Sequence, residues 1–109
     1  MEMTNENKHD FRFKTHGPKY MVRGPRHEWG IIVLKTGDEL GAHYHNEVEE
    51  TFYFLYGKGI MKIGEKEFPA GPGDAFRIEP KEAHNIFCRE EFKIIFIKCP
   101  YLPEDKVAI

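Results

Sequence analysis

The stretch GDELGAHYHNEVEETFYFLYG, residues 37–57, contains the residues that decide the fold. Two histidines, His43 and His45, are separated by a single tyrosine, and Glu50 follows five residues later at the start of an aromatic, strongly β-prone run. Residues i and i+2 of a strand lie on one face, about 6–7 Å apart, so two imidazoles at this spacing can converge on one ion. The stretch therefore predicts strands that carry a pair of metal-binding histidines and a nearby carboxylate.

Short apolar runs of the same kind occur on both sides of this stretch. They are rich in β-branched and aromatic residues, are divided by Gly, Pro and charged clusters, and show no helical spacing over ten or more residues. The runs cover residues 11–14, 20–24, 29–35, 51–57, 59–64, 66–68, 75–79, 84–90 and 92–99. Gly57-Lys58-Gly59 and Gly64-Glu65-Lys66 read as turns. Eight or nine short strands predict an all-β domain, either a sandwich or a double-sheet jelly roll.

Alternation along the strands also assigns side chains to faces. Glu50 shares a face with Phe52 and Phe54, whereas Glu49 lies on the opposite face of the same strand. We therefore expect Glu50, not Glu49, to point into the fold. His84 begins another alternating strand and is the third histidine of interest. Each signal alone has an ordinary alternative, since a histidine pair is often a surface feature and the acidic cluster can be a solvated turn.

The joint spacing adds a family resemblance. Gly37, five residues, His43-Tyr44-His45, four residues, Glu50, six residues and Gly57 resemble the first conserved motif of the cupin superfamily. That motif is a glycine, five residues, HxH, three or four residues, a glutamate, six residues and a glycine. Every fixed position of the motif is filled in this sequence.

A second stretch, from Gly73 to Cys88, resembles the second cupin motif. Its glycine and its histidine, His84, fall in register. Three positions depart from the motif, with Glu79 in place of a proline, Lys81 in place of a glycine, and Cys88 in place of an asparagine. Pro80 still allows a tight turn before His84.

The resemblance implies a single jelly-roll barrel, also called a double-stranded β-helix. It also implies one divalent transition-metal ion, bound by His43, His45, Glu50 and His84. Three imidazoles and a carboxylate suit Fe, Mn, Ni, Zn or Co, and the ligand set does not choose among them. We expect residues 1–10 to form a flexible N-terminal tail, residues 11–100 the cupin barrel and residues 101–109 a C-terminal tail on the surface.

The inward faces of the barrel are expected to line a largely apolar pocket. The pocket-lining candidates are Phe52, Phe54, Met61, Ile63, Phe76, Ile78, Ile86 and Cys88. An apolar wall beside an open metal position suits a small organic ligand. The alternative is that these residues simply fill the barrel core. Arg23, Arg26 and His27 are candidates for contacts with an anionic group at the pocket mouth, or they form a solvated loop with Glu28.

The family resemblance leaves the function open, because similar barrels include dioxygenases, isomerases, lyases and sugar-binding proteins. We expect a metal-dependent enzyme that acts on a small organic molecule. The alternatives are a non-catalytic module that anchors a small ligand or sugar through the metal, and a protein in which the metal mainly stabilises the fold.

Composition excludes several other classes. The net charge of −2 provides no basic field for nucleic acid or an anionic membrane. No apolar run approaches the ~20 residues needed to span a bilayer, and residues 1–10 lack the apolar core of a signal peptide. A cytoplasmic location is the expectation, with Cys88 and Cys99 as free thiols.

The strand at 92–99 predicts assembly. Phe92, Ile94 and Phe96 lie on one face and Ile95 and Ile97 on the other. Only one face can point into the barrel, so the other needs cover from the N-terminal segment or from a partner subunit. We expect a homodimer.

Overall fold

Two long antiparallel strands, β4 (Glu49–Ile63) and β7 (His84–Cys99), form the centre of the fold and pair along most of their length. The computed structural model describes all residues 1–109 and contains eight strands. The other elements are a 3₁₀ turn η1 (Glu6–Lys8), β1 (Gly17–Arg23), β2 (Glu28–Leu34), β3 (His43–His45), β5 (Lys66–Ala70), β6 (Ala75–Ile78) and β8 (Lys106–Ala108). No helix in the structure has the length and apolar character needed to cross a bilayer.

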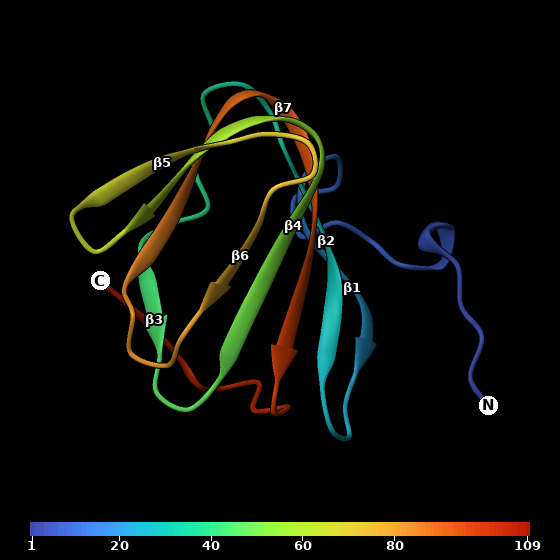
Figure 1. Cartoon of the computed structure of the whole chain (residues 1–109). Coiled ribbons are helices and arrows are strands. Elements are labelled where there is room, and N and C mark those ends of the chain that lie inside the picture. Colours follow the sequence, from blue (N-terminus) through green and yellow to red (C-terminus); the bar gives the residue numbers. More distant parts are fainter.

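The strands curl around a common interior. β2 and β1 extend the sheet from one edge of β7, while β5 and β6 both pair with β4. β3 pairs with β7 on one side and with β8 on the other. Figure 1 shows β4 and β7 running side by side and curving over the top of the barrel, with β3 closing its far side. The predicted jelly-roll barrel is confirmed.

The core consists of the inward-facing positions of these strands. Phe52 and Phe54 on β4 and Phe92 on β7 are fully buried, as the alternation predicted. Full burial of such a side chain contributes roughly 1.5–3 kcal/mol relative to exposure. Edge-to-face packing of Phe54 against Phe92, with ring centroids 5.4 Å apart, orders this part of the core.

The expected turn at Gly57-Lys58-Gly59 is wrong, because β4 passes through these residues as a strand. The pairing of β4 with β7 shifts register here, between Phe54 and Gly59. Gly57 has φ +85°, and a Cβ on it would lie 2.2 Å from the carbonyl oxygen of Glu91. The two glycines thus allow a bulge inside a continuous strand, a role that glycine commonly has in sheets. Because β4 continues through the bulge, its partner β7 also continues, and the runs at 84–90 and 92–99 form one strand.

The strand expected at residues 11–14 is also wrong. Phe11 and Lys14 form only an isolated bridge across a tight turn, and Lys14 has φ +67°. The first regular strand instead begins at Gly17. Two alternating aromatic residues do not suffice for a strand when no neighbouring strand offers pairing partners.

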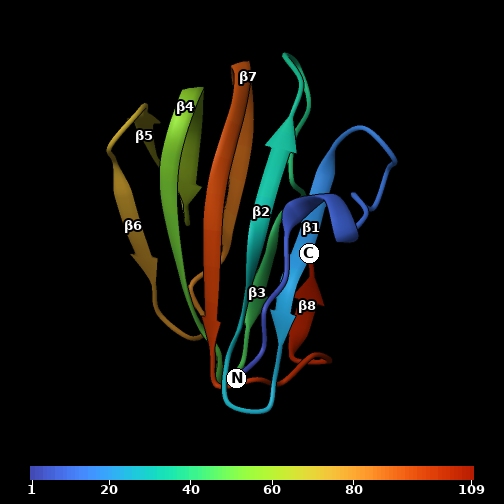
Figure 2. The ribbon, with the colours of Figure 1, turned by 90° about the vertical axis from the view of Figure 1, so that its right-hand side faces the viewer.

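Both ends of the chain contact the barrel. Glu6 accepts a hydrogen bond from the Lys19 ammonium through its backbone carbonyl, and its carboxylate lies 3.0 Å from Lys93 Nζ. In Figure 2 the N-terminal segment crosses the face formed by β1 and β2. Near the other end, β8 pairs with β3 through Val107 opposite Tyr44.

Candidate metal centre

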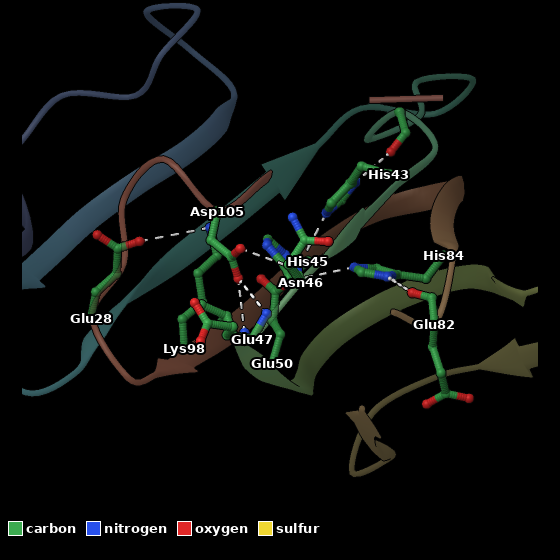
Figure 3. Close-up of polar contacts among 12 residues, drawn as sticks. Glu28, His43, His45, Asn46, Glu47, Glu50, Glu82, His84, Lys98 and Asp105 are labelled. Carbon is green, nitrogen blue, oxygen red and sulfur yellow. Dashed lines mark hydrogen bonds and ion pairs between the residues drawn. The ribbon is translucent and has the colours of Figure 1, made fainter. Parts of the chain in front are cut away.

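Three strands bring the four predicted ligands together inside the barrel. His43 lies directly opposite His84 where β3 pairs with β7, and His45 points the same way two residues further along β3. Glu50 enters from β4. Figure 3 shows the three imidazole rings directed toward one another with Glu50 beside them. The group that the sequence predicted is therefore assembled in space.

The donor atoms of the four side chains are close. Glu50 Oε1 lies 3.1 Å from His45 Nε2, 3.3 Å from His84 Nε2 and 4.0 Å from His43 Nε2. All four donor atoms fall within 4.8 Å of one another. Two ligands on opposite sides of one ion, each at ~2.0–2.2 Å, are separated by about 4.0–4.4 Å, so only small side-chain adjustments are needed to enclose an ion.

Backbone carbonyls fix the orientation of two of the rings. The carbonyl of Gly41 accepts a hydrogen bond from His43 Nδ1 at 2.8 Å, and that of Glu82 accepts one from His84 Nδ1 at 2.9 Å. A carbonyl can only accept, so Nδ1 of each ring carries a proton and Nε2 is the ring atom directed at the Glu50 carboxylate. Backbone contacts of this kind are those that orient metal-bound histidines.

The electrostatics of Glu50 and His43 favour the forms that bind a metal ion. Burial alone would raise the pKa of the Glu50 carboxyl, but contacts with the three imidazoles and the nearby charge of Lys98 hold it well below its usual value. Burial lowers the pKa of His43 despite its contacts with Glu50 and Gly41. An ionised carboxylate and a neutral imidazole are the forms that bind a metal ion.

Burial separates the two candidate glutamates. Glu50 is 3% exposed, as are His43 and His45, and His84 is 2% exposed. Glu49, on the opposite face, lies 3.9 Å from the exposed side chain of Arg77. Alternation in β4 therefore places Glu50 in the group and Glu49 outside it. The residues present fit a divalent ion in their chemistry, spacing and burial.

Comparison with known proteins agrees with this geometry. The family model described as "Cupin domain" matches residues 30–98. The chain belongs to the cupin family. The matched region contains β3 to β6 and all but the outermost residues of β2 and β7.

Individual cupin-like relatives are distant in sequence. The protein MJ1618 of Methanocaldococcus jannaschii is 27% identical over 83 residues, which cover 76% of this chain and 66% of that protein. The structure of KdgF from Halomonas sp. superposes with a TM-score of 0.83 at 17% identity, covering 95% of this chain and 97% of that one. Ectoine synthase from P. lautus gives 0.79 at 17% identity, with coverages of 100% and 90%. At this identity the two structures support the fold alone.

The eight residues expected to line an apolar pocket lie in or against the hydrophobic core of the cupin barrel. Two of them, Ile63 and Phe76, pack against the core cluster. The other six are buried members of that cluster, namely Phe52, Phe54, Met61, Ile78, Ile86 and Cys88. The hollows that reach His43, His45 and Glu50 are lined by other residues, described next.

Two hollows adjoin the metal centre, and cationic side chains are prominent in both. The larger, of about 180 Å³, reaches His45, and the smaller, of about 20 Å³, reaches His43 and Glu50. Both are lined by the side chains Arg12, Tyr20, Lys98 and Lys106. Sequence reasoning missed these cations in the cupin interior. Only Lys98 carried a signal, because it continues the inward alternation of Phe92, Ile94 and Phe96.

The segment after Pro100 helps to shape this end of the barrel. The Asp105 carboxylate accepts hydrogen bonds from the backbone N–H groups of Asn46, Glu47 and Val48, at 3.2, 2.8 and 2.9 Å. These bonds hold β8 beside β3, and so place Lys106 opposite His45. Figure 3 shows Asp105 between the turn at Asn46 and Lys98.

Proposed function

We propose that this cupin binds one divalent transition-metal ion through His43, His45, Glu50 and His84 and uses it as an enzyme acting on a small organic molecule. The observation that carries the proposal is the convergence of three ring nitrogens and a carboxylate at a buried point beside an open hollow. The name of one structural neighbour, ectoine synthase, supports the view that such a barrel can host an enzyme.

When bound, the ion supplies Lewis acidity at the end of the hollow. The chain's own residues supply the rest. Gly41 and Glu82 hold His43 and His84 in one ring orientation, and Glu50 contributes the negative charge that neutralises part of the ion's charge. The buried aromatic core beneath the group, including Phe52 and Phe96, excludes water from its inner side. Substrate must therefore approach from the hollow.

A pair of neighbouring glutamates gives a matched test. We expect Glu50→Gln to lower metal content and to abolish turnover of a substrate found by screening with the metal-loaded protein. Glu49→Gln, which removes the same charge at a half-buried site outside the group, should leave both unchanged. The absence of turnover with Fe, Mn, Ni, Zn and Co, over a broad panel of small organic molecules, would contradict the enzymatic proposal.

A metal-anchored binding module is the second candidate. One observation favours it: Glu28, the carboxylate that lines the larger hollow, is already engaged by Arg23 and Lys98, so it is poorly placed to exchange protons with a ligand. For a binding module, ligands would raise the melting temperature of the metal-loaded protein with no product formed. Product detected after prolonged incubation would decide for the enzyme.

A further inference from the structure

A row of alternating charges crosses the inner face of the barrel beside the metal centre. Arg23 on β1 pairs with Glu28 on β2, Glu28 pairs with Lys98 on β7, and Lys98 pairs with Glu50 on β4. Each residue is the cross-strand neighbour of the next. The row therefore links a metal ligand to a set of cations on adjoining strands.

The cations of this region outnumber the carboxylates that face them. Glu28 Oε2 lies 2.8 Å from Arg23 Nε, and Glu28 Oε1 lies 3.7 Å from Lys98 Nζ. Arg12 and Lys106 form no ion pair with any carboxylate of the chain. Two carboxylates, Glu28 and Glu50, thus face the positive charge of four side chains, which are Arg12, Arg23, Lys98 and Lys106.

Lys98 is held inward. Its side chain is 16% exposed, and its ammonium lies 5.3 Å from the ring centre of Phe96 and 5.6 Å from that of Tyr20. Glu28, Glu50 and the two rings compensate part of the cost of holding this cation away from water, and its nearest carboxylate oxygen is still 3.7 Å away. An anion in the hollow would provide the rest of that compensation.

Lys106, which lines the larger hollow, lacks a carboxylate partner, as Arg12 does. It lines both hollows together with Lys98 and Arg12. Like charges that repel one another around a hollow are the usual arrangement of a site that awaits an anion.

We propose that the larger hollow binds a small organic acid, whose carboxylate is held by Lys98, Lys106 and Arg12 while the rest of the molecule faces the metal centre. Two lysines and an arginine provide donors to a carboxylate from several directions. The volume of about 180 Å³ equals that of about six water molecules, which suits an acid of a few carbon atoms. The proposal names the substrate class of the proposed metal-dependent function. It rests on that function only for the contact between the acid and the metal ion.

Lactate and its neutral amide, lactamide, provide a matched pair of probes, with malate and succinate as further acids. We expect lactate or another of these acids to bind the zinc-loaded protein at low ionic strength, and lactamide to bind at least tenfold more weakly by calorimetry. Lys98→Met should weaken acid binding at least tenfold. Arg12→Met and Lys106→Met change exposed side chains, so they test the same charge without disturbing the core. Lys66→Met, on the exposed edge strand β5, is the control and should bind like the wild type.

Several results would overturn the acid site. They are equal binding of lactate and lactamide, no binding of any of the three acids, unchanged affinity in all three hollow variants, or tighter binding of inorganic phosphate than of every acid. Failure of the metal proposal is distinguishable. If no metal binds but the acids still bind the wild type and not the Lys98 variant, the acid site stands and the metal centre does not.

Discussion

Lys98 on β7 lies directly opposite Glu50 on β4, so a cation of the hollow and a carboxylate of the metal centre are neighbours on the same inward face. The pairing explains how two chemical functions share one end of a small barrel. Glu50 faces the histidines, whereas Lys98 lies near Glu28 and the open side. The register of two strands thus sets both the centre and the charge beside it.

Acidification should destabilise the metal-free protein through His43 and Glu50. Both have a pKa lowered by folding, so the unfolded chain binds each proton at a higher pH than the folded chain does. Stability therefore falls as pH drops below 6.5 for His43 and below 4.5 for Glu50. Urea unfolding of chelator-treated protein between pH 7 and 3.5 measures the effect.

Glu50→Gln removes one of these two contributions. The variant should lose less stability than the wild type below pH 4.5, while Glu49→Gln should follow the wild-type curve. Identical pH dependence in the wild type and Glu50→Gln would show that the buried carboxylate is not held ionised by the histidines.

The bulge in β4 predicts a large difference between two glycines of similar backbone conformation. Gly57 and Gly37 have φ of +85° and +93°, so alanine at either position costs about 1–2 kcal/mol of backbone strain. At Gly57 the new Cβ would also overlap the Glu91 carbonyl, whereas at Gly37 it meets nothing within 4 Å. We expect Gly57→Ala to cost at least ~3 kcal/mol in total. Equal losses in thermal or urea unfolding would place the bulge elsewhere.

Asp105 should matter more than its surface position suggests. Asp105→Ala removes the acceptor for three backbone N–H groups and should cost about 1–3 kcal/mol of stability. It should also weaken acid binding, because β8 carries Lys106. Glu104→Ala, at the neighbouring exposed position, is the control. An unchanged urea midpoint for Asp105→Ala would mean that the C-terminal segment is held by other contacts.

The homodimer stays a prediction from the sequence. Tyr53, Leu55 and Ile97 remain 43%, 42% and 45% exposed on the outer face of β4 and β7. If a second copy covers this face, Ile97→Glu should yield monomers, whereas Met3→Glu, at a site 85% exposed, should not. Light scattering at micromolar concentration measures the mass. A monomeric wild type would contradict the prediction.

The four donors could be predicted because strand alternation and the resemblance to the two cupin motifs point to the same residues. His43 and His45 lie two residues apart in one strand and so share a face. Glu50 lies on the same face of its strand as Phe52 and Phe54. Burial confirms that choice of face. A short spacing pattern can therefore predict a site when regular strands carry it.

Other features depended on long-range contacts that a single sequence does not display. Gly57 reads as a turn residue, yet the Glu91 carbonyl across the sheet makes it part of a bulge. Lys98 continues the inward alternation of its strand, but only the pairing of β7 with β2 and β4 shows that it lies beside Glu28 and Glu50. The segment that begins at Pro100 has two prolines and no alternation, so nothing local marks the strand that pairs with β3.

The most direct test is to locate a metal ion by anomalous diffraction from crystals of protein purified without chelator and supplied with Zn, Mn, Fe, Ni or Co, with elemental analysis of the same sample. We predict about one equivalent of ion per chain, with one peak in bonding contact with Nε2 of His43, His45 and His84 and with the Glu50 carboxylate. Protein that takes up none of the five metals, or a peak bound away from these four side chains, would contradict the account.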